Sequence, residues 1–155
     1  MALVGLDAGQ YRVRVAATDG SGKSGAVDVA VNLSLTPAGP LTLGGLLLQA
    51  AGSDGSNKPR LVFSTEEKVV VLLEVYGQIA GPLTVRFELA TSDTGPAISR
   101  PLVTGGAMKE PDRFQVEGEV PIAELMPGDY VIRAIVGIEG QPEGTVLRTF
   151  RKVAK

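Results

Sequence analysis

The chain contains one sequence pattern twice. Residues 6–31 align without a gap with residues 125–150, at an offset of 119 residues. The identical positions are Leu6, Gly9, Tyr11, Arg14, Gly25 and Val27 in the first copy and Leu125, Gly128, Tyr130, Arg133, Gly144 and Val146 in the second. A repeat at this distance is a repeat of domains rather than of a small solenoid unit. It predicts one complete domain, preceded by only the last two strands of a similar one, and thus a piece of a longer protein.

Apolar and polar residues alternate along both copies, which is the pattern of half-buried strands. Each copy is therefore expected to form a β-hairpin, and the Gly- and Ser-rich residues 19–25 are expected to form the loop of the first. We assign residues 1–35 to the terminal hairpin of a truncated domain and residues 36–40, with two prolines and a glycine, to a linker. Residues 41–155 are expected to form the complete domain.

The remaining pattern predicts an all-β domain. The 20 Gly and 10 Pro residues separate many short apolar segments, and no segment has a helical period longer than about two turns. We expect an immunoglobulin- or fibronectin-III-like antiparallel β-sandwich of seven to eight strands, preceded by an orphan hairpin. In detail, the pattern predicts an edge strand with a bulge over 41–49, a polar loop over 51–59, a short strand over 60–63, a strand buried on both faces over 68–76, an edge strand over 98–104, a loop over 105–112, one helical or 3₁₀ turn over 122–126 and a bulge near 148–149.

The most specific structural motif is Leu-x-x-Gly-x-Tyr. It occurs as Leu6, Gly9 and Tyr11, and again as Leu125, Gly128 and Tyr130. In immunoglobulin-like sandwiches a tyrosine near the start of strand F returns its hydroxyl to the backbone a few residues earlier, which is called a tyrosine corner. The glycine would allow the tight turn and the leucine would pack beneath it. The bland alternative is that both tyrosines are simply good strand formers after a turn.

Composition excludes several kinds of chemistry. The chain has no Cys and no His, so zinc sites of the Cys/His type and Ser-His-Asp or Cys-His catalysis are impossible. A net charge of −2 argues against nucleic-acid binding, which needs a basic face. The apolar stretches at 41–51 and 69–73 are too short to span a bilayer. We therefore predict no enzyme activity, no cofactor, no nucleic-acid partner and no membrane span.

The loop at residues 17–25 imitates two nucleotide-binding motifs. It nearly fits the phosphate-binding loop through Gly22, Lys23 and Ser24, and it also fits the dinucleotide fingerprint. Both motifs work only where a helix begins beside the phosphates. The residues after Gly25 have a β pattern, so we predict a hairpin turn and no phosphate site.

Two loops have oxygen-rich residues that could suggest calcium. Asp19 and Ser21 begin an EF-like spacing, but Lys23 stands where an oxygen ligand belongs, and Ala30 takes the place of the bidentate Glu. The second loop, within 51–59, carries Asp54, Ser56 and Asn57. Solvated turns are the default expectation for both, and calcium binding stays open.

Carboxylates are plentiful, but nothing pairs them across a cleft. A glycosidase needs two on facing elements, whereas Glu117 and Glu119 share one strand face. Only Tyr76 among the aromatic residues considered is free to form a sugar-binding platform. Glu74 interrupts an apolar strand, and it is either an outward residue near the strand end or a buried polar group at an interface.

Several segments together give the chain a likeness to a known bacterial type: residues 6–25, Pro40-Leu-Thr-Leu-Gly-Gly-Leu-Leu-Leu48 and Arg148-Thr-Phe-Arg-Lys-Val. The chain resembles the C-terminal β-rich tail of secreted or envelope proteins that carry a von Willebrand factor type A domain upstream. The resemblance implies export, with the signal upstream of Met1, and a binding or scaffolding role. The metal motif of the A domain, Asp-x-Ser-x-Ser, is incomplete at Asp19-Gly-Ser21-Gly-Lys23, so that activity does not carry over.

These observations favour a non-catalytic extracytoplasmic module, secreted or in the cell envelope, that spaces or presents neighbouring domains of a longer chain. The alternative is a protein- or glycan-binding module that acts through loops 51–59, 92–97 and 105–112. Exposed apolar residues near 105–112 would favour binding, and an evenly polar surface would favour a spacer. The apolar face of the orphan hairpin is expected to pack on the complete domain or on a second chain, so self-association through residues 1–35 is a further expectation.

Overall fold

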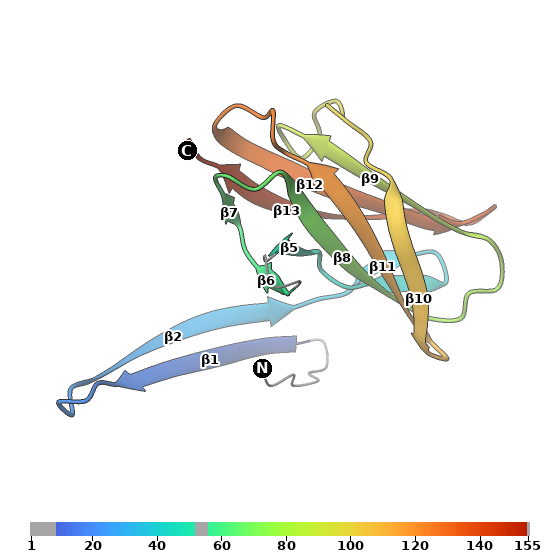
Figure 1. Cartoon of the computed structure of the whole chain (residues 1–155). Helices are drawn as coiled ribbons and strands as arrows, with labels where there is room; N and C mark the ends of the chain where they lie inside the picture. The colour runs from blue at the N-terminus through green and yellow to red at the C-terminus, as the bar shows by residue number, and fades with distance from the viewer. Residues whose placement is uncertain (1–8, 52–55, 155) are drawn as a thin grey trace. The chain divides into compact units, whose positions relative to one another are not determined.

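The computed structural model describes residues 9–51 and 56–154 of the chain. The chain divides into two compact units, Met1–Leu35 and Thr36–Lys155, which are described separately. The described residues form thirteen β-strands and no helix (Figure 1). The expected all-β fold class is therefore confirmed.

The first unit is a two-stranded antiparallel hairpin. Strands β1 (Gly9–Thr18) and β2 (Ser24–Leu33) pair along their whole length, from Gly9 opposite Leu33 to Thr18 opposite Ser24. The chain reverses through a turn at Gly22, whose φ of 82° suits glycine because no Cβ is present to clash. A strand begins at Ser24, so the helix that a phosphate-binding loop needs does not form here.

The closing hairpin of the second unit has the same register as the first. Strands β12 (Gly128–Ile138) and β13 (Gly144–Lys152) pair from Gly128 opposite Lys152 to Val136 opposite Gly144, and each pair is the β1–β2 pair shifted by the repeat offset. Pairing runs without interruption, so the bulge expected near 148–149 was wrong. Leu147 is exposed rather than inward, and Val146 and Phe150 on the other face are buried.

The second unit is a sandwich of two sheets, which form the two layers of the domain in Figure 1. One sheet has the order β10-β11-β8-β4-β3, with β5 paired to β8 and β6 paired to β5. Its strands are β3 (Thr36–Ala38), β4 (Leu41–Leu43), β5 (Leu47–Ala51), β6 (Asn57–Pro59), β8 (Lys68–Tyr76), β10 (Val103–Glu110) and β11 (Arg113–Pro121). The other sheet has the order β7-β13-β12-β9, with β7 (Val62–Phe63) parallel to β13, and with β9 (Leu83–Ala90) antiparallel to β12.

The core lies between the facing apolar sides of the two sheets. Leu73 of β8, Phe87 of β9 and Ile132 of β12 are fully buried there. Phe150 of β13 stands edge-on to Phe63 of β7, with ring centroids 5.5 Å apart. Both sheets therefore contribute large side chains, and burying them is the main stabilising term of the domain.

The face of β8 that points away from the core is only partly covered. Its residues Leu72, Glu74 and Tyr76 are half-buried, whereas Leu73 and Val75 on the core face are buried. Val70 on this outer face is buried, so the expectation that the strand is buried on both faces holds at Val70 and is wrong from Leu72 onward. Alternation is a better guide than mean hydropathy here, because an antiparallel sheet of a sandwich has only one face on the core.

The segment from residue 36 to 63 differs most from expectation. Residues 36–38, expected as a linker, form β3 on the outer edge of the sheet, where a proline needs no backbone N–H. The single edge strand expected over 41–49 is two strands, β4 and β5, which both pair with β8 and are flanked by β3 and β6. Residues 57–59 of the expected polar loop form β6. Five short strands in this segment raise the strand number above the seven or eight expected.

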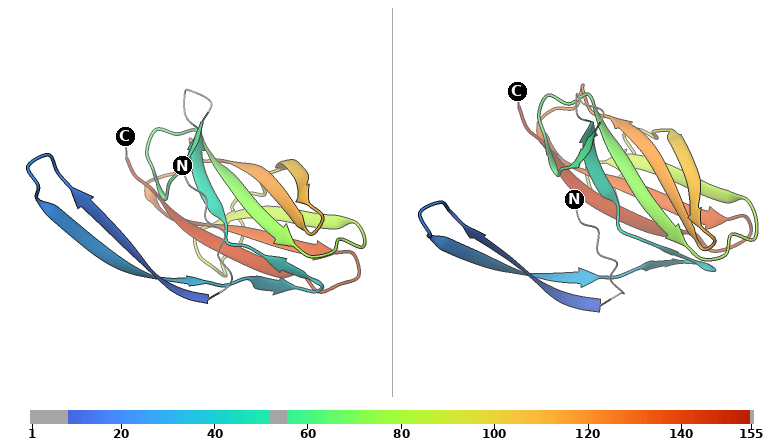
Figure 2. Two further views of the ribbon diagram at one scale, coloured as in Figure 1. Left: turned by 90° about the horizontal axis from the view of Figure 1, so that it is seen from below. Right: turned by 60° about the horizontal axis from the view of Figure 1, so that its bottom comes forward.

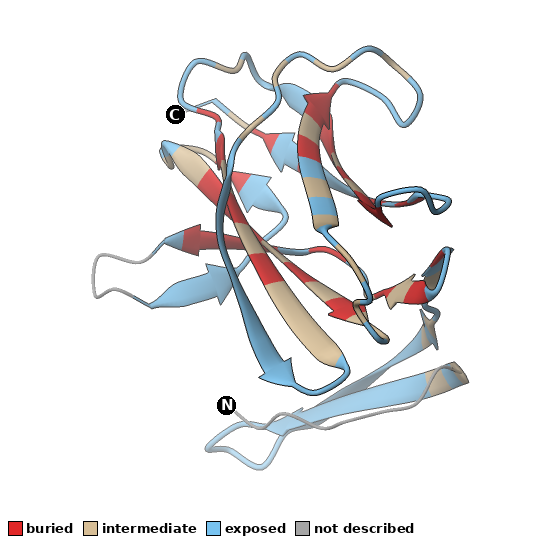
Figure 3. Ribbon diagram, turned by 90° about the vertical axis from the view of Figure 1, so that its right-hand side faces the viewer, coloured by how far each residue is buried: buried red, intermediate tan, exposed pale blue. Residues whose placement is uncertain are grey.

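A second correction concerns residues 98–112. Of the expected strand over 98–104, Ser99 forms a single bridge with Leu89 and residues 103–104 begin β10. The expected loop over 105–112 is mostly strand β10. Strand β10 is exposed along its length (Figure 3), and its pairing with β11 is shifted at two points. It has little alternation in sequence, because backbone pairing rather than burial of one face holds it in place.

The polypeptide enters and leaves the sandwich at opposite ends of β13. At the entry, β3 lies against the start of β13, where a Cβ on Gly144 would come within 2.5 Å of the Pro37 carbonyl oxygen. At the exit, β13 ends at Lys152 beside Phe63. The eight residue-to-residue steps from Gly144 to Lys152 in β13 separate these points by about 27 Å at ~3.4 Å per step. Figure 2 shows β13 crossing the domain between its two ends.

Candidate functional site

Tyr130 forms the hydrogen bond that a tyrosine corner requires. Its hydroxyl donates to the carbonyl oxygen of Met126, four residues earlier, at 2.8 Å. The side chain is buried, and its ring stacks on Phe150 with centroids 5.7 Å apart. A turn in which the Leu125 N–H donates to the Ile122 carbonyl brings the backbone round. It takes the place of the helical or 3₁₀ turn expected over 122–126. Tyr130 therefore anchors the connection into β12.

The glycine of the motif lies beneath the tyrosine ring in both copies. A Cβ on Gly128 would lie 3.7 Å from the Tyr130 ring, and a Cβ on Gly9 would lie 3.5 Å from the Tyr11 ring. The two tyrosines thus have the same local relationship to the glycine two residues before. Leu125 packs against the core, and Leu6 lies outside the described residues.

The loop after β1 uses its carboxylate to hold its own backbone. One oxygen of Asp19 accepts hydrogen bonds from the Ser21 N–H (2.8 Å), the Ser21 hydroxyl (2.7 Å) and the Lys23 N–H (3.0 Å). The Ser21 hydroxyl and these two backbone donors lower the pKa of Asp19 below its usual range. The arrangement is that of an Asx turn, which satisfies the expectation of a solvated turn at this loop.

The second oxygen-rich loop is described only in part. Asp54 lies outside the described residues, Ser56 is exposed and Asn57 belongs to β6. Within residues 9–51 and 56–154, no three His, Cys, Asp or Glu side chains come together as a metal site would require.

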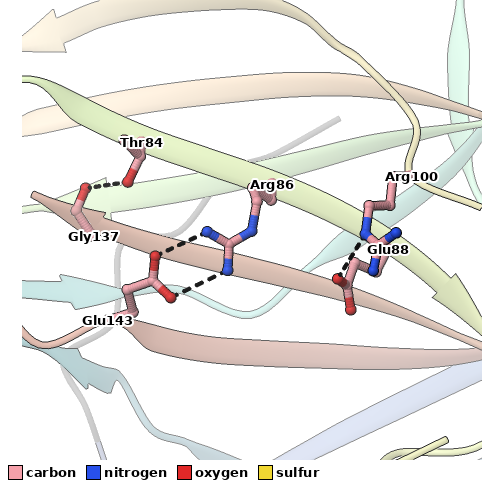
Figure 4. Close-up of polar contacts among 6 residues, drawn as sticks. All are labelled: Thr84, Arg86, Glu88, Arg100, Gly137 and Glu143. Atoms are coloured by element: carbon pink, nitrogen blue, oxygen red, sulfur yellow. Dashed lines mark hydrogen bonds and ion pairs between the residues drawn. The ribbon is translucent and has the colours of Figure 1, made fainter. Parts of the chain in front are cut away.

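The outer face of the four-stranded sheet carries a row of polar contacts (Figure 4). Arg86 of β9 forms two hydrogen bonds with Glu143, at 3.0 and 3.2 Å, and the Thr84 hydroxyl donates to the Gly137 carbonyl at 3.1 Å. Glu88 is held by Arg100 at 3.4 Å. These contacts bind the residues after β12 and the residues after β9 to the sheet.

Glu88 also forms the most buried ion pair described. It lies directly opposite Arg133 on β12, with Nη2 and Oε2 2.9 Å apart, and both side chains are nearly buried, at 12% and 14% exposed. Arg133 further donates to the Asp93 carbonyl at 3.0 Å. The repeat-equivalent Arg14 instead pairs across its own hairpin with Asp28, at 2.7 and 2.8 Å. The difference follows from the partner strand, because Leu147 replaces Asp28 in the second copy.

The outer face of the other sheet carries a second cluster, which sequence reasoning did not identify. Glu74 of β8 accepts hydrogen bonds from Tyr76 and from Arg113 of β11. Partial burial opposes ionisation of Glu74, but the Tyr76 hydroxyl and the Arg113 guanidinium outweigh it and lower its pKa. Burial and the neighbouring carboxylate raise the pKa of Tyr76 to about 12. Glu74 is thus the outward residue of the two alternatives, and Tyr76 is engaged with it.

An apolar hollow of about 450 Å³ lies where the connection between β9 and β10 passes the turn after β11. Leu89, Ile98, Pro101, Pro121 and Leu125 are among its lining residues. Beside it, four exposed apolar side chains follow the chain into β10, and we call this set the edge patch. Its members and their exposed fractions are Ile98 (52%), Leu102 (81%), Val103 (41%) and Met108 (57%).

The two carboxylates expected on one strand face, Glu117 and Glu119, lie on a single strand, β11. Glu119 is paired with Lys68 of the adjacent strand at 2.6 Å.

In the part of the chain that the structure describes, no helix has the length and apolarity needed to cross a membrane. Comparison of the chain with protein-family models, curated proteins and solved structures gives no match.

Proposed function

We propose that the second unit is a non-catalytic structural module that spaces or presents neighbouring domains of a longer chain. The observation that carries the proposal is the placement of entry and exit at opposite ends of β13. A module built in this way extends the path of the polypeptide by the length of the domain, about 27 Å. A module with both ends on one side would add no such separation.

The strand order supports an immunoglobulin-like assignment within this proposal. The orders β10-β11-β8-β4 and β13-β12-β9 correspond to the D-E-B-A and G-F-C arrangements of such sandwiches. On this assignment Tyr130 stands at the start of strand F, and Ile132 takes the place of the second cysteine. The apolar contact of Ile132 in the core would then replace the disulfide that many of these domains use.

The polar side chains support a structural role rather than catalysis. Arg86, Glu88, Arg133 and Glu74 each take part in a contact between strands or between a strand and a loop. Groups engaged in this way hold the sheets and their loops in register. With no His or Cys in the sequence, the Ser-His-Asp and Cys-His arrangements of many hydrolases cannot form.

A distance measurement tests the spacer directly. The chain has no native cysteine, so Pro37→Cys and Ala154→Cys can carry spin labels at the entry and the exit. Double electron–electron resonance should give a single distribution of label-to-label distances, centred near the ~27 Å expected from β13. Its width should be no greater than the flexibility of the two label side chains produces. The distribution should stay the same on addition of calcium or on crowding. A broad distribution, or one centred below about 15 Å, would contradict the proposal.

The edge patch favours a second candidate function, the binding of a protein segment. Exposed apolar residues beside an exposed edge strand are a common arrangement for adding an extended peptide. The sequence predicted that residues 105–112 would bind as a loop. Because most of them form β10, the binding surface in this candidate is the edge strand itself. A phage-displayed peptide library, a glycan array and a calcium titration test it together. Peptides that bind the wild type and lose binding to Leu102→Lys, but not to the outer-face control Arg86→Gln, would support this candidate.

We further propose that the module belongs to an exported protein and lies next to a larger domain. The resemblance to tails of proteins with a von Willebrand factor type A domain supports a place in a secreted or cell-envelope protein, next to a larger domain. Determining the parent open reading frame would test this. A parent with an export signal would support the proposal, and a parent without one would contradict it.

A further inference from the structure

The β1–β2 hairpin has one apolar face and one polar face. Three cross-strand pairs make up the apolar face, and they are Tyr11–Val31, Val13–Val29 and Val15–Val27. Four of these side chains are exposed, namely Val13 (43%), Val15 (57%), Val27 (57%) and Val29 (49%). The other face carries the Arg14–Asp28 ion pair. An isolated two-stranded hairpin is marginally stable in water, so a face of this kind needs a cover.

The second copy shows what covers such a face. The residues equivalent to the apolar face are Tyr130, Ile132, Ala134, Val146, Arg148 and Phe150. All except Arg148 are buried, in a core shared with the opposite sheet of β8 and β11. The cover is thus a β-sheet whose inward face is lined by Val and Leu. Because the two hairpins have the same register, side chains at equivalent positions lie on the same face of each hairpin.

The second copy also shows what pairs with the two outer edges. β12 pairs with β9 antiparallel along 131–138, and β13 pairs with β7 parallel at 151–152. The equivalent edges are residues 12–19 of the first hairpin and residues 32–33. Among the described residues, β1 and β2 pair only with each other. All the strands that cover or flank β12–β13 precede them in the chain, within residues 36–121.

We propose that the β1–β2 hairpin is the docking surface for the remainder of a second sandwich domain, supplied by the same polypeptide on the N-terminal side of the hairpin. That remainder places an apolar sheet on the face of Tyr11, Val13 and Val15. It adds one strand antiparallel to β1 and a short strand parallel to β2. The inference rests on the proposed modular function, and it names the partner that one end of the protein requires.

A duplicated chain tests the proposal. Residues 36–124 are repeated ahead of residue 6 of the chain, so that Leu6 takes the position of Leu125 and the first hairpin takes the position of β12–β13. Hydrogen exchange is read on peptides from residues 9–33, whose sequence occurs once in this molecule. The outer-edge amides of β1 should exchange roughly 100-fold more slowly than in the original chain, as amides move from a frayed to a globally protected class.

Matched variants make the result specific. In the duplicated chain, Val15→Asp on the apolar face should abolish the protection, whereas Arg12→Gln on the polar face should preserve it. Residues 36–124 normally pack against Ala134 and Phe150, whose equivalents in the first hairpin are Val15 and Val31. A Val15→Ala, Val31→Phe version therefore gives the hairpin side chains of the size that this core accommodates. If neither the first version nor this version protects the hairpin while the second unit remains folded, the proposal is overturned.

Two further measurements separate the alternatives. If sedimentation shows that the original chain dimerises and its hairpin amides become protected with increasing concentration, a second copy is the cover and the proposal is overturned. The label distance between residues 37 and 154, measured in the same duplicated chain, depends only on the second unit. A normal distance with an unprotected hairpin would therefore reject this inference alone, and an abnormal distance with a protected hairpin would reject the spacer function alone.

Discussion

The hydroxyl of Tyr130 donates a hydrogen bond to the carbonyl oxygen of Met126, and this contact ties the start of β12 to the turn before it. Tyr130→Phe removes the donor, keeps the ring and leaves the Met126 carbonyl without this bond. We expect a loss of about 1 kcal/mol in the free energy of unfolding, which is the usual size for such a hydrogen bond. Urea denaturation of the full chain would measure it.

The control for this variant is Met126→Ala. The Met126 side chain is 74% exposed, and only its backbone carbonyl takes part in the contact. Its substitution should leave the unfolding midpoint nearly unchanged. Equal losses from both variants would show that the side chain of Met126, rather than the hydrogen bond, stabilises the corner.

Gly118 leaves room for a core aromatic ring. A Cβ at this position would come within 2.5 Å of the fully buried Phe87 ring on the facing sheet. Gly118→Ala should therefore destabilise the sandwich by roughly 1–3 kcal/mol, the range for overpacked cores. Gly105→Ala on the neighbouring strand β10 is the control, because nothing lies within 4 Å of its Cβ position. Thermal unfolding followed by circular dichroism should show a lower Tm for the first variant only.

The Glu88–Arg133 pair predicts an asymmetric response. Glu88→Gln leaves the nearly buried Arg133 guanidinium without its carboxylate, and we expect a loss of roughly 2–4 kcal/mol. Arg100→Gln removes the 72% exposed partner of the same Glu88 and should cost less than about 1 kcal/mol. Urea denaturation compares the two. Similar small losses would mean that water solvates Arg133 well enough to replace Glu88.

Glu74 predicts a dependence of stability on pH. Its pKa in the folded state is below the ordinary value of 4.5, so the carboxylate stabilises the fold fully above pH 4.5. That stabilisation is lost as the pH falls through the folded-state pKa. Wild type should be more stable than Glu74→Gln at neutral pH, and the difference should shrink at about pH 3. Unfolding midpoints in urea at both pH values measure it, and a constant difference would contradict the prediction.

Much of the architecture could be predicted from local patterns. Alternation located β1, β2 and both strands of the closing hairpin, because each of these strands has one apolar face, and a run of apolar residues located β8. The motif around Tyr130 could be identified from its spacing, since the glycine, the turn and the tyrosine are adjacent in sequence. The turn at Asp19 could be predicted for the same reason, because its hydrogen bonds reach only two to four residues.

Other elements could not be read in this way. β3 contains a proline, and β10 contains two adjacent glycines and no clear alternation, so neither has a local β signal. Each becomes a strand because a partner, β4 or β11, offers backbone hydrogen bonds. The cluster of Glu74, Tyr76 and Arg113 was missed because Arg113 is 39 residues from Glu74 in sequence and belongs to another strand.

The amino-acid sequence by itself determined that the chain is all-β, that its two ends carry equivalent hairpins and that the usual His and Cys chemistry is impossible. These properties follow from residue types and from spacings of a few residues, which act through backbone conformation and burial of one strand face. The tertiary structure alone decided the partners of β3 and β10, the pairing of Arg133 with Glu88 and the position of entry and exit on β13. Each of these depends on strands that are distant in sequence, and packing of the two sheets selects their neighbours.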